Sequence, residues 1–215
     1  MIRLGAGRLD RLVAVGAHCD DIAIGAGGTL LTLCLTRPGV RVDALVLSGG
    51  GGEREREERA ALAAFCPGAD LRLTVLKLPD GRMPAHWDEA KAAVEELRGR
   101  TEPDLVLAPR TEDAHQDHRG LAKLVSTAFR DHLVLGYEIV KWDGDLGRPV
   151  AYQPLAPELA EEKVRLLQEH YPSQRHRPWY DREAFLGLAR IRGIECHARY
   201  AEAYAVTKLT LNLGG

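Results

Sequence analysis

The stretch LVAVGAHCDDIAIGAGGTLLTLCL, residues 12–35, joins an apolar run to a helical pattern through a short polar turn. Residues 12–15 are leucine, alanine and valine, which is typical of a strand buried on both faces. From Ile22 to Leu35 the apolar residues recur three and four positions apart, which predicts a helix. His18 and Asp21 lie in the turn between the two segments. A buried strand that leads directly into a helix is typical of a parallel α/β sheet.

The same alternation of apolar runs and helical patterns continues through the first two thirds of the chain. It predicts strands at 42–47, 71–78, 104–108 and 133–140, and helices at 53–65, 87–97 and 118–129. After a turn-rich segment, the chain has predicted helices at 158–170 and 182–194 and a strand-like segment at Tyr204–Leu211. The pattern predicts an α/β, Rossmann-like fold, in which a mostly parallel sheet is flanked by helices on both faces. No repeat or composition shift divides the chain, so we expect a single domain over residues 1–215.

Net charge and composition argue against several classes of protein. The 29 Lys and Arg residues against 31 Asp and Glu give a net charge of −2, which leaves no basic field to hold nucleic acid or an anionic membrane. No apolar run reaches the roughly 18 residues of a membrane helix, and the N-terminus lacks the pattern of a secretory signal. The four cysteines lie far apart, which predicts free thiols. We expect a cytoplasmic enzyme that binds neither nucleic acid nor membrane, and a homo-oligomer is left open.

Two polar motifs at the ends of predicted strands have the residue types of a metal site. His18 and Asp21 follow the first strand, His115 and His118 follow the fourth, and each pair is three residues apart. Ligands of open parallel sheets bind outside the carboxyl ends of the strands, so both motifs are expected at one edge of the sheet. A catalytic zinc site takes three protein ligands and keeps one position open. His18, Asp21 and one histidine of the second motif meet that number.

Neighbouring residues offer further roles at this edge of the sheet. Asp20 is left free to take a proton from water, and Asp117 is placed to orient a histidine through its second ring nitrogen. Arg54 begins the next helix, where its guanidinium can hold sugar hydroxyls or a phosphate, whereas the rest of the run from Glu53 to Arg59 is typical of a solvated helix face. Asp80 follows the third strand, where it can either reach the same rim or simply form part of a turn. Arg54 and Asp80 are therefore our candidates for substrate binding.

Glycine-rich segments allow a different interpretation. The run Gly49–Gly52 follows the second strand, where backbone amides can cradle a phosphate, but it lacks the G-x-G-x-x-G fingerprint. Gly25, Gly27 and Gly28 lie within the first predicted helix, and we interpret them as points of close packing on the sheet. The glycine turns leave open a nucleotide- or S-adenosylmethionine-binding Rossmann enzyme. Such an enzyme would bind its cofactor in the presence of a chelator and would leave the His/Asp motifs without a role.

The two polar motifs together resemble those of a known family. Ala17-His18-Cys19-Asp20-Asp21 followed by Gly25 and Gly28, and His115-Gln116-Asp117-His118, are similar to the A-H-P-D-D-E and H-x-D-H motifs of the PIG-L/LmbE-like metal-dependent N-acetylglucosaminyl deacetylases. Supporting stretches are Arg54-Glu55-Arg56-Glu57 with Ala60-Ala61, Asp80-Gly81-Arg82-Met83-Pro84, Pro172-Ser173-Gln174 and Tyr200-Ala201-Glu202-Ala203-Tyr204. The resemblance covers nearly the whole chain.

The resemblance implies an activity and the residues that carry it. The implied reaction removes the N-acetyl group from an N-acetylglucosamine-type amino-sugar conjugate and releases acetate and a free amine. One divalent metal would take part, zinc in the first place, with other divalent metals left open. The implied roles are zinc ligands for His18, Asp21 and His118, general base for Asp20, oxyanion stabilisation or protonation of the amine for His115, and orientation of His115 for Asp117.

The first motif departs from the family pattern at two positions. Cys19 stands at the usual proline, where it offers either a packing side chain or an extra soft metal donor, and Ile22 stands at the usual glutamate. The loss of a carboxylate at position 22 makes a third hypothesis conceivable, a catalytically silent family member that binds sugar without releasing acetate. Metal analysis followed by assays of acetate release distinguishes these hypotheses.

Overall fold

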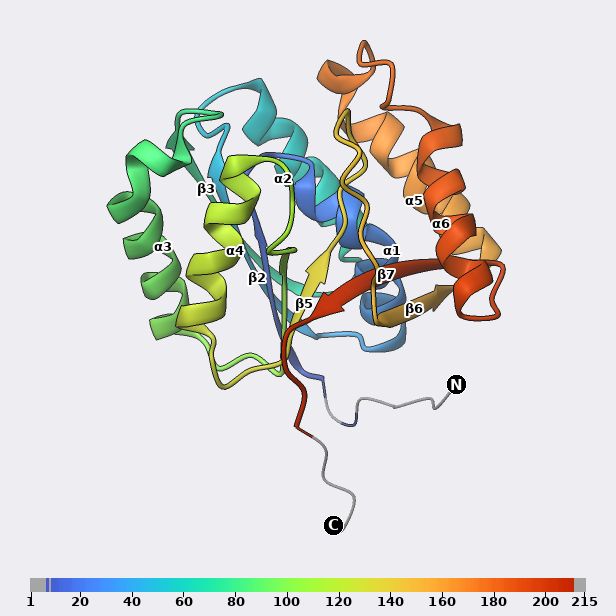
Figure 1. The fold of residues 1–215 in the computed structure, drawn as a ribbon, viewed down its shortest axis with the longest axis horizontal. Helices are drawn as coiled ribbons and strands as arrows, with labels where there is room; N and C mark the ends of the chain where they lie inside the picture. Colours follow the sequence, from blue (N-terminus) through green and yellow to red (C-terminus); the bar gives the residue numbers. More distant parts are fainter. Residues whose placement is uncertain (1–6, 8, 211–215) are drawn as a thin grey trace.

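A seven-stranded sheet forms the centre of the structure, a computed structural model that describes residue 7 and residues 9–210 (Figure 1). In chain order the strands are β1 (Arg11–Gly16), β2 (Arg41–Ser48), β3 (Asp70–Leu78), β4 (Leu105–Pro109), β5 (Val134–Tyr137), β6 (Ala151–Leu155) and β7 (Tyr200–Val206). The order across the sheet is β3-β2-β1-β4-β5-β7-β6, in which β1 to β5 run parallel and β7 is antiparallel to both of its neighbours. The predicted mostly parallel α/β sheet is confirmed.

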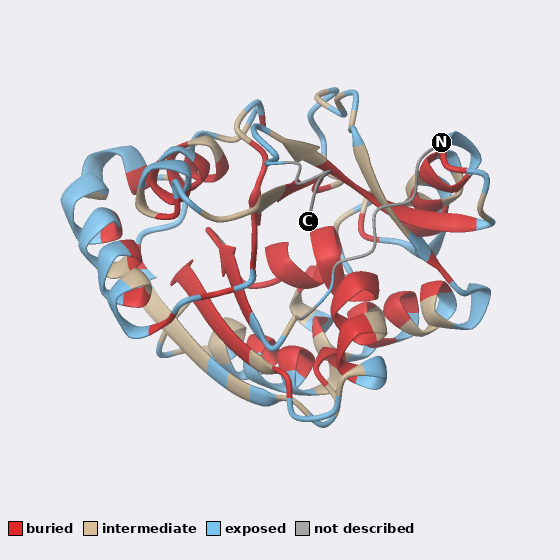
Figure 2. Cartoon of the chain, turned by 90° about the horizontal axis from the view of Figure 1, so that it is seen from below, coloured by how far each residue is buried: buried red, intermediate tan, exposed pale blue. Residues whose placement is uncertain are grey.

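Helices cover both faces of this sheet, as predicted. They are α1 (Asp21–Thr36), α2 (Glu53–Phe65), α3 (Trp87–Arg100), α4 (Gln116–Ala128), α5 (Pro157–His170) and α6 (Arg182–Glu195), with short 3-10 turns at Met83–His86 and Pro172–Gln174. Leu12 and Ala14 of β1 belong to the core under α1, α2, α5 and α6, whereas Val13 and Val15 belong to the core under α3 and α4. Figure 2 shows the central strands buried and the outer sides of the helices exposed. Burial on both faces explains why the strands are continuously apolar.

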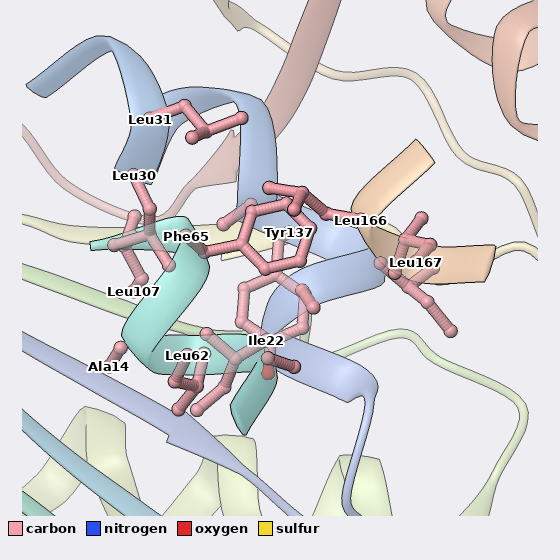
Figure 3. Close-up of a cluster of buried hydrophobic side chains, with 14 of the residues drawn as sticks. Ala14, Ile22, Leu30, Leu31, Leu62, Phe65, Leu107, Tyr137, Leu166 and Leu167 are labelled. Atoms are coloured by element: carbon pink, nitrogen blue, oxygen red, sulfur yellow. The ribbon is translucent and has the colours of Figure 1, made fainter. Parts of the chain in front are cut away.

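Helix α1 lies inside the larger core, where it contacts both the sheet and α2. Figure 3 shows Ile22 of α1 in one cluster with Leu62 and Phe65 of α2 and with Tyr137 of β5. The hydroxyl of Tyr137 donates to the carbonyl of Val15 at 2.6 Å, which connects the end of β5 to β1 next to the turn that begins α1. The start of α1 is therefore held against the carboxyl ends of β1 and β5.

The glycines of α1 allow this close approach. A Cβ atom at Gly25 would lie 2.1 Å from Cδ2 of Tyr137, and one at Gly28 would lie 2.5 Å from Cδ1 of Leu155 in β6. The predicted close packing on the sheet is confirmed at these two positions. Gly27 instead faces an aromatic ring of α2, 2.7 Å from an added Cβ.

A buried carboxylate connects the last strand to α1. Glu202 of β7 accepts the backbone N–H groups of Gly28 and Thr29, each at 2.7 Å, and pairs with Nζ of Lys163 from α5 at 2.7 Å. Buried charges are tolerated only when they are paired and hydrogen-bonded, and this one is. Strand β7 and helix α5 therefore hold the middle of α1 in place.

Several predicted boundaries differ from the observed ones. Strand β5 ends at Tyr137 and not at residue 140, because Glu138 leaves the sheet for an ion pair with Arg192 of α6. Strand β7 occupies Tyr200–Val206 and not Tyr204–Leu211, and Leu211 lies outside the described residues. Strand β6 was not predicted at all. Helix α4 begins two residues earlier than predicted, since the ring of His115 accepts a backbone N–H of its first turn.

None of the helices within residues 9–210 is long and apolar enough to cross a membrane. All four cysteines are free, as the sequence predicted, and all four are buried. The location in the cell and the extent of the domain over residues 1–215 stay predictions, since residues 1–6, 8 and 211–215 lie outside the described part of the chain.

We predict that Gly25→Ala destabilises the protein by about 1–3 kcal/mol, the usual effect of forcing an extra methyl group into a packed core. Gly187→Ala is the matched control, because Gly187 lies in α6 and no atom of the described residues beyond its own stretch of helix comes within 4 Å of an added Cβ. The control should stabilise by roughly 0.5–1 kcal/mol through higher helix propensity. Urea unfolding of both variants measures the two effects, and equal stabilities would contradict the close contact between α1 and β5.

Candidate active site

A cleft of about 290 Å³ opens beside the carboxyl ends of β1 and β4, where the order of the strands reverses. This is the position at which open α/β sheets bind ligands. Seven of the eight predicted site residues line the cleft, namely His18, Asp20, Asp21, Arg54, Asp80, His115 and His118. The turn between β1 and α1, the start of α2 and the segment between β4 and α4 supply most of them.

Three donor atoms converge at the base of the cleft. Nδ1 of His18 lies 3.0 Å from Nε2 of His118 and 3.4 Å from Oδ2 of Asp21. Nε2 of His118 lies 3.3 Å from Oδ2 of Asp21. Donor atoms around a tetrahedral zinc ion with bonds of 2.0–2.1 Å lie about 3.3 Å from one another. The spacing and the donor types therefore fit one divalent cation. His115 adds a further nitrogen within 4.8 Å of those of the other two histidines.

The carboxylate of Asp21 is held in its ionised form. Burial acts to raise the pKa of Asp21, but the adjacent His118 and His18 outweigh burial and hold the pKa well below its usual range. The same oxygen accepts the backbone N–H groups of Ala17 at 2.9 Å and His18 at 2.8 Å. A negatively charged, fixed oxygen is what a divalent cation requires of a carboxylate ligand.

Asp113, which the sequence analysis did not single out, holds the other side of the His118 ring. Its Oδ1 lies 3.0 Å from Nδ1 of His118 and accepts the backbone N–H of His115 at 2.8 Å, and its Oδ2 pairs with Nζ of Lys141 at 3.1 Å. A carboxylate at the second ring nitrogen is common behind metal-binding histidines. The sequence signal for Asp113 was an acidic residue shortly before the histidine motif. This signal does not single out Asp113, because the adjacent Glu112 is also acidic and is exposed.

Asp117 lies elsewhere than predicted. Its carboxylate contacts Nε2 of His18 at 3.2 Å and accepts the backbone N–H groups of Gly81 and Met83 at 2.8 and 3.1 Å. The expected side-chain contact with His115 is replaced by a backbone one, since Nδ1 of His115 accepts the N–H of Asp117 at 3.3 Å. The turn that follows β3 comes close to the first turn of α4 and takes the Asp117 carboxylate. The Asp117 side chain therefore contacts the first histidine motif, and its contact with His115 of the second is made by its backbone N–H.

Asp80 and Arg54 reach the cleft, but both make contacts within the protein. Oδ1 of Asp80 lies 3.0 Å from Nε2 of His18, although the Asp80 side chain is 76% exposed. The guanidinium of Arg54 donates to Oδ2 of Asp20 at 2.9 Å, to Glu57 at 2.9 Å and to the hydroxyl of Ser173 at 3.1 Å. Their role in substrate binding stays a prediction.

Asp20 has an unusual backbone conformation. Its φ is 108° and its ψ is −24°, a left-handed region that non-glycine residues rarely adopt. Burial raises the pKa of Asp20 to about 6, although the nearby Arg54 acts to lower it. The Asp20 N–H donates to Oε2 of Glu58 at 2.8 Å.

Glu57 and Glu58 lie in a segment for which the sequence predicts a solvated helix face, and for both buried residues that prediction is wrong, most clearly for Glu58. Glu58 is fully buried, and its Oε2 also accepts the hydroxyl of Tyr171 at 2.6 Å. Burial raises the pKa of Glu58 to about 8, although the hydrogen bond from Tyr171 acts to lower it. The partner that accounts for its burial lies 113 positions away, so the local pattern contains no signal for it.

Cys19 belongs to the lining of the same cleft, but its surroundings favour the neutral thiol. It is buried, and its Sγ donates to the carbonyl of Ser48 at 3.4 Å. Burial raises the pKa of the Cys19 thiol far above its usual range, with the nearby Glu58 acting in the same direction. The thiolate is the form that binds metals, so the geometry favours the packing interpretation.

The glycine run after β2 offers little to a phosphate. The N–H of Gly50 already donates to the carbonyl of Leu76 at 2.8 Å, and the N–H of Gly51 donates to Glu55 at 2.5 Å. Phosphate-binding loops need such amides free to point at the ligand. The interpretation as a nucleotide site therefore loses its main support.

Comparison with known protein families assigns the chain. The model of the PIG-L family, described as GlcNAc-PI de-N-acetylase, matches residues 13–129, which is more than half of the chain. The chain therefore belongs to the PIG-L family. The resemblance of the two motifs is confirmed, and the homology supports a deacetylase, a hydrolase that acts on amides.

Individual relatives agree with this assignment. YaiS of Escherichia coli (strain K12), described as an uncharacterized deacetylase, is 26% identical over 172 residues, which are 74% of this chain and 89% of YaiS. Among solved structures, the fold is similar to N,N'-diacetylchitobiose deacetylase from Pyrococcus horikoshii, with a TM-score of 0.72 and 19% identity over 93% of this chain and 84% of that one. It is also similar to the 4-carboxy-2-hydroxymuconate hydratase GalB of Pseudomonas putida KT2440, with a TM-score of 0.70 and 17% identity. That match covers 96% of this chain and 100% of GalB. At these identities the structural likeness concerns the fold alone.

The raised pKa of Glu58 predicts a pH-dependent stability. A folded-state pKa of about 8, against about 4.3 in an unfolded chain, means that the folded protein binds this proton more tightly. The Glu58 contribution to the free energy of unfolding is therefore full below pH 4 and is lost as pH rises to 8, by up to about 1.4 kcal/mol per pH unit. Glu58→Gln, which does not titrate, should become more stable relative to the native chain over this window.

Urea unfolding of the metal-free proteins from pH 5 to 9 measures this difference. Glu53→Gln is the matched control, because Glu53 lies on the same helix and is exposed. Its stability should follow that of the native chain across the window. Parallel pH curves for Glu58→Gln and the native chain would show that Glu58 is ionised in the folded protein.

Proposed function

We propose that the chain is a zinc-dependent N-deacetylase that removes the acetyl group from an N-acetylglucosamine-type amino-sugar conjugate and releases acetate and a free amine. His18, Asp21 and His118 would hold one divalent cation. The observation that carries the proposal is the convergence of their three donor atoms within 3.0–3.4 Å of one another, beside a cleft at the sheet edge. Membership of the PIG-L family supports the reaction class.

The bound cation would polarise the amide carbonyl and lower the pKa of water at the site. Asp20 is our general base, since its carboxylate lines the cleft and belongs to the residue next to the ligand Asp21. Arg54 donates to Oδ2 of Asp20 at 2.9 Å, which restricts the orientation of this carboxylate. Removal of a proton from the attacking water by a positioned carboxylate is general base catalysis.

His115 is our donor to the developing oxyanion and to the leaving nitrogen. Burial lowers the pKa of His115, and the neighbouring His118 and His18 act in the same direction, which favours the neutral imidazole. Because Nδ1 accepts the N–H of Asp117, the proton of the neutral ring lies on Nε2. A neutral ring in this tautomer still donates a hydrogen bond to the oxyanion, whereas transfer of a proton to the leaving nitrogen requires the imidazolium form of His115.

The shape of the cleft supports a sugar as substrate. Its volume of about 290 Å³ is near the lower end of the range for small-molecule sites, which suits a single sugar ring. Trp142 and Trp179 also line the cleft, and the side chain of Trp142 is largely exposed. Aromatic faces offer an apolar surface to a ring whose hydroxyls need polar partners, and Asp80 and Arg54 lie in the same lining.

We predict that His118→Ala lowers the metal content by about one equivalent per chain, because one of three protein ligands is lost. Metal analysis of the purified proteins measures this, and activity should be lost together with the metal. His176→Ala is the control, since His176 is exposed and is not part of the cleft lining. Retention of the metal in His118→Ala would overturn the ligand assignment.

We predict that Asp20→Asn keeps the metal but loses about two to four orders of magnitude in kcat, the usual effect of removing a positioned base. Acetate release from a panel of N-acetylglucosamine conjugates measures the rate. Asp131→Asn is the control: Asp131 is exposed and far from Asp20 in the sequence, so this substitution should leave the rate of acetate release unchanged. Acetate release by no member of the panel from the metal-loaded native chain would reject the deacetylase proposal, whereas sugar binding alone would favour a silent family member.

A further inference from the structure

One face of α2 holds Asp20 at both its side chain and its backbone. Arg54 and Glu58 are four residues apart and therefore lie one turn apart on the same side of the helix. Arg54 donates to Oδ2 of Asp20 at 2.9 Å, and it also donates to the carbonyl of Cys19. Glu58 accepts the N–H of Asp20 through Oε2 at 2.8 Å. The residue proposed as the base is thus fixed at its carboxylate and at its amide by one element.

The backbone of Asp20 needs such a partner. Its left-handed conformation, with φ at 108°, is costly for a residue with a Cβ atom. The carbonyl of Asp20 accepts the N–H of Ile24 at 2.8 Å and so begins α1, while its N–H points away from that helix toward α2. A peptide flip here would move the Asp20 carboxylate and the adjacent Asp21 together.

Glu58 is not explained by packing. The residue is fully buried, and Leu62, one turn further along α2, shows that an apolar side chain suits this face of the helix. Burying a carboxyl group is unfavourable unless it is hydrogen-bonded. Oε2 of Glu58 accepts hydrogen bonds from the backbone N–H of Asp20 and from the hydroxyl of the buried Tyr171. Oε1 has no hydrogen-bond partner among the described residues. The polar end of Glu58 is therefore directed at Asp20 and Tyr171.

This buried carboxyl group lies close to the first polar motif. The family motif has a glutamate two residues after the base, where this chain has Ile22, and Ile22 is fully buried among apolar side chains. The buried carboxyl group next to the motif comes from α2 instead of α1.

We propose that Glu58 is a positioning residue that holds the left-handed backbone of Asp20, and with it the catalytic orientation of the Asp20 carboxylate. This inference rests on the proposed function for its effect on catalysis. Its effect on the backbone of Asp20 does not depend on that function.

The test compares Glu58→Leu, Glu58→Gln and the control Leu62→Ala in the chain of residues 1–215. In Glu58→Leu the acceptor for the Asp20 N–H is lost, so hydrogen exchange of this amide should become at least tenfold faster. The metal-loaded variant should lose 10- to 100-fold in kcat, the usual effect of a small misplacement of a catalytic group, with KM within a few fold and the metal retained. Glu58→Gln keeps an acceptor oxygen at Oε2 and places its amide nitrogen at the unpaired Oε1, so it should recover most of the loss.

Leu62→Ala separates positioning from general loss of stability. It removes packing from the same face of α2 without touching Asp20, so it should lower Tm while kcat and exchange of the Asp20 amide stay near native values. Equal kcat losses in Leu62→Ala and Glu58→Leu, native exchange and kcat in Glu58→Leu, or a loss in Glu58→Gln as large as in Glu58→Leu would each overturn the proposal. If the native chain releases no acetate, the deacetylase proposal fails, and the exchange measurement still decides whether Glu58 holds Asp20.

Discussion

The turn at Asp20 determines where the polar groups between β1 and α1 lie. Asp20 adopts a left-handed backbone conformation, which lets β1 lead into α1 within a few residues. As a result, Nδ1 of His18 and Oδ2 of Asp21 lie close together at the candidate metal centre. The close contact of Gly25 with Tyr137 holds the helix that follows, so the turn has little freedom. The second motif, on α4, needs only to bring His118 to this point. The geometry of the candidate metal centre thus follows from one strand-to-helix turn and its support.

Buried carboxyl groups connect this turn to the rest of the molecule. Glu58 reaches it from α2, Asp113 supports His118 from the loop after β4, and Glu202 holds the middle of α1 from β7. Each has at least two hydrogen-bonding or charged partners, which offsets the unfavourable removal of its polar end from water. Contacts of this kind are directional, so they fix positions that apolar packing alone would leave adjustable.

The sequence predicted the strands and helices of the parallel part because their apolar periodicity is local. It also predicted that both histidine motifs meet, since carboxyl ends of parallel strands share one edge. The features that it missed depend on residues far away in the sequence. Glu58 is buried because the hydroxyl of Tyr171 is its hydrogen-bond donor. The Asp117 side chain contacts His18 instead of His115 because the turn at Gly81 lies next to it and donates to its carboxylate. Strand β6 was missed because Pro154 and its polar neighbours resemble a loop, and only pairing with β7 makes them a strand.

The bond between Glu202 and α1 has a consequence for the order of folding. Glu202 is separated from Gly28 by 174 positions, and β7, which carries it, lies between β5 and β6 in the sheet. Contacts between such distant positions are slow to form, because a long loop must close before they contribute. During synthesis, α1 leaves the ribosome well before β7 and lacks this partner until β7 emerges. The segment that bears the first histidine motif therefore gains this support only after β7 has been synthesised.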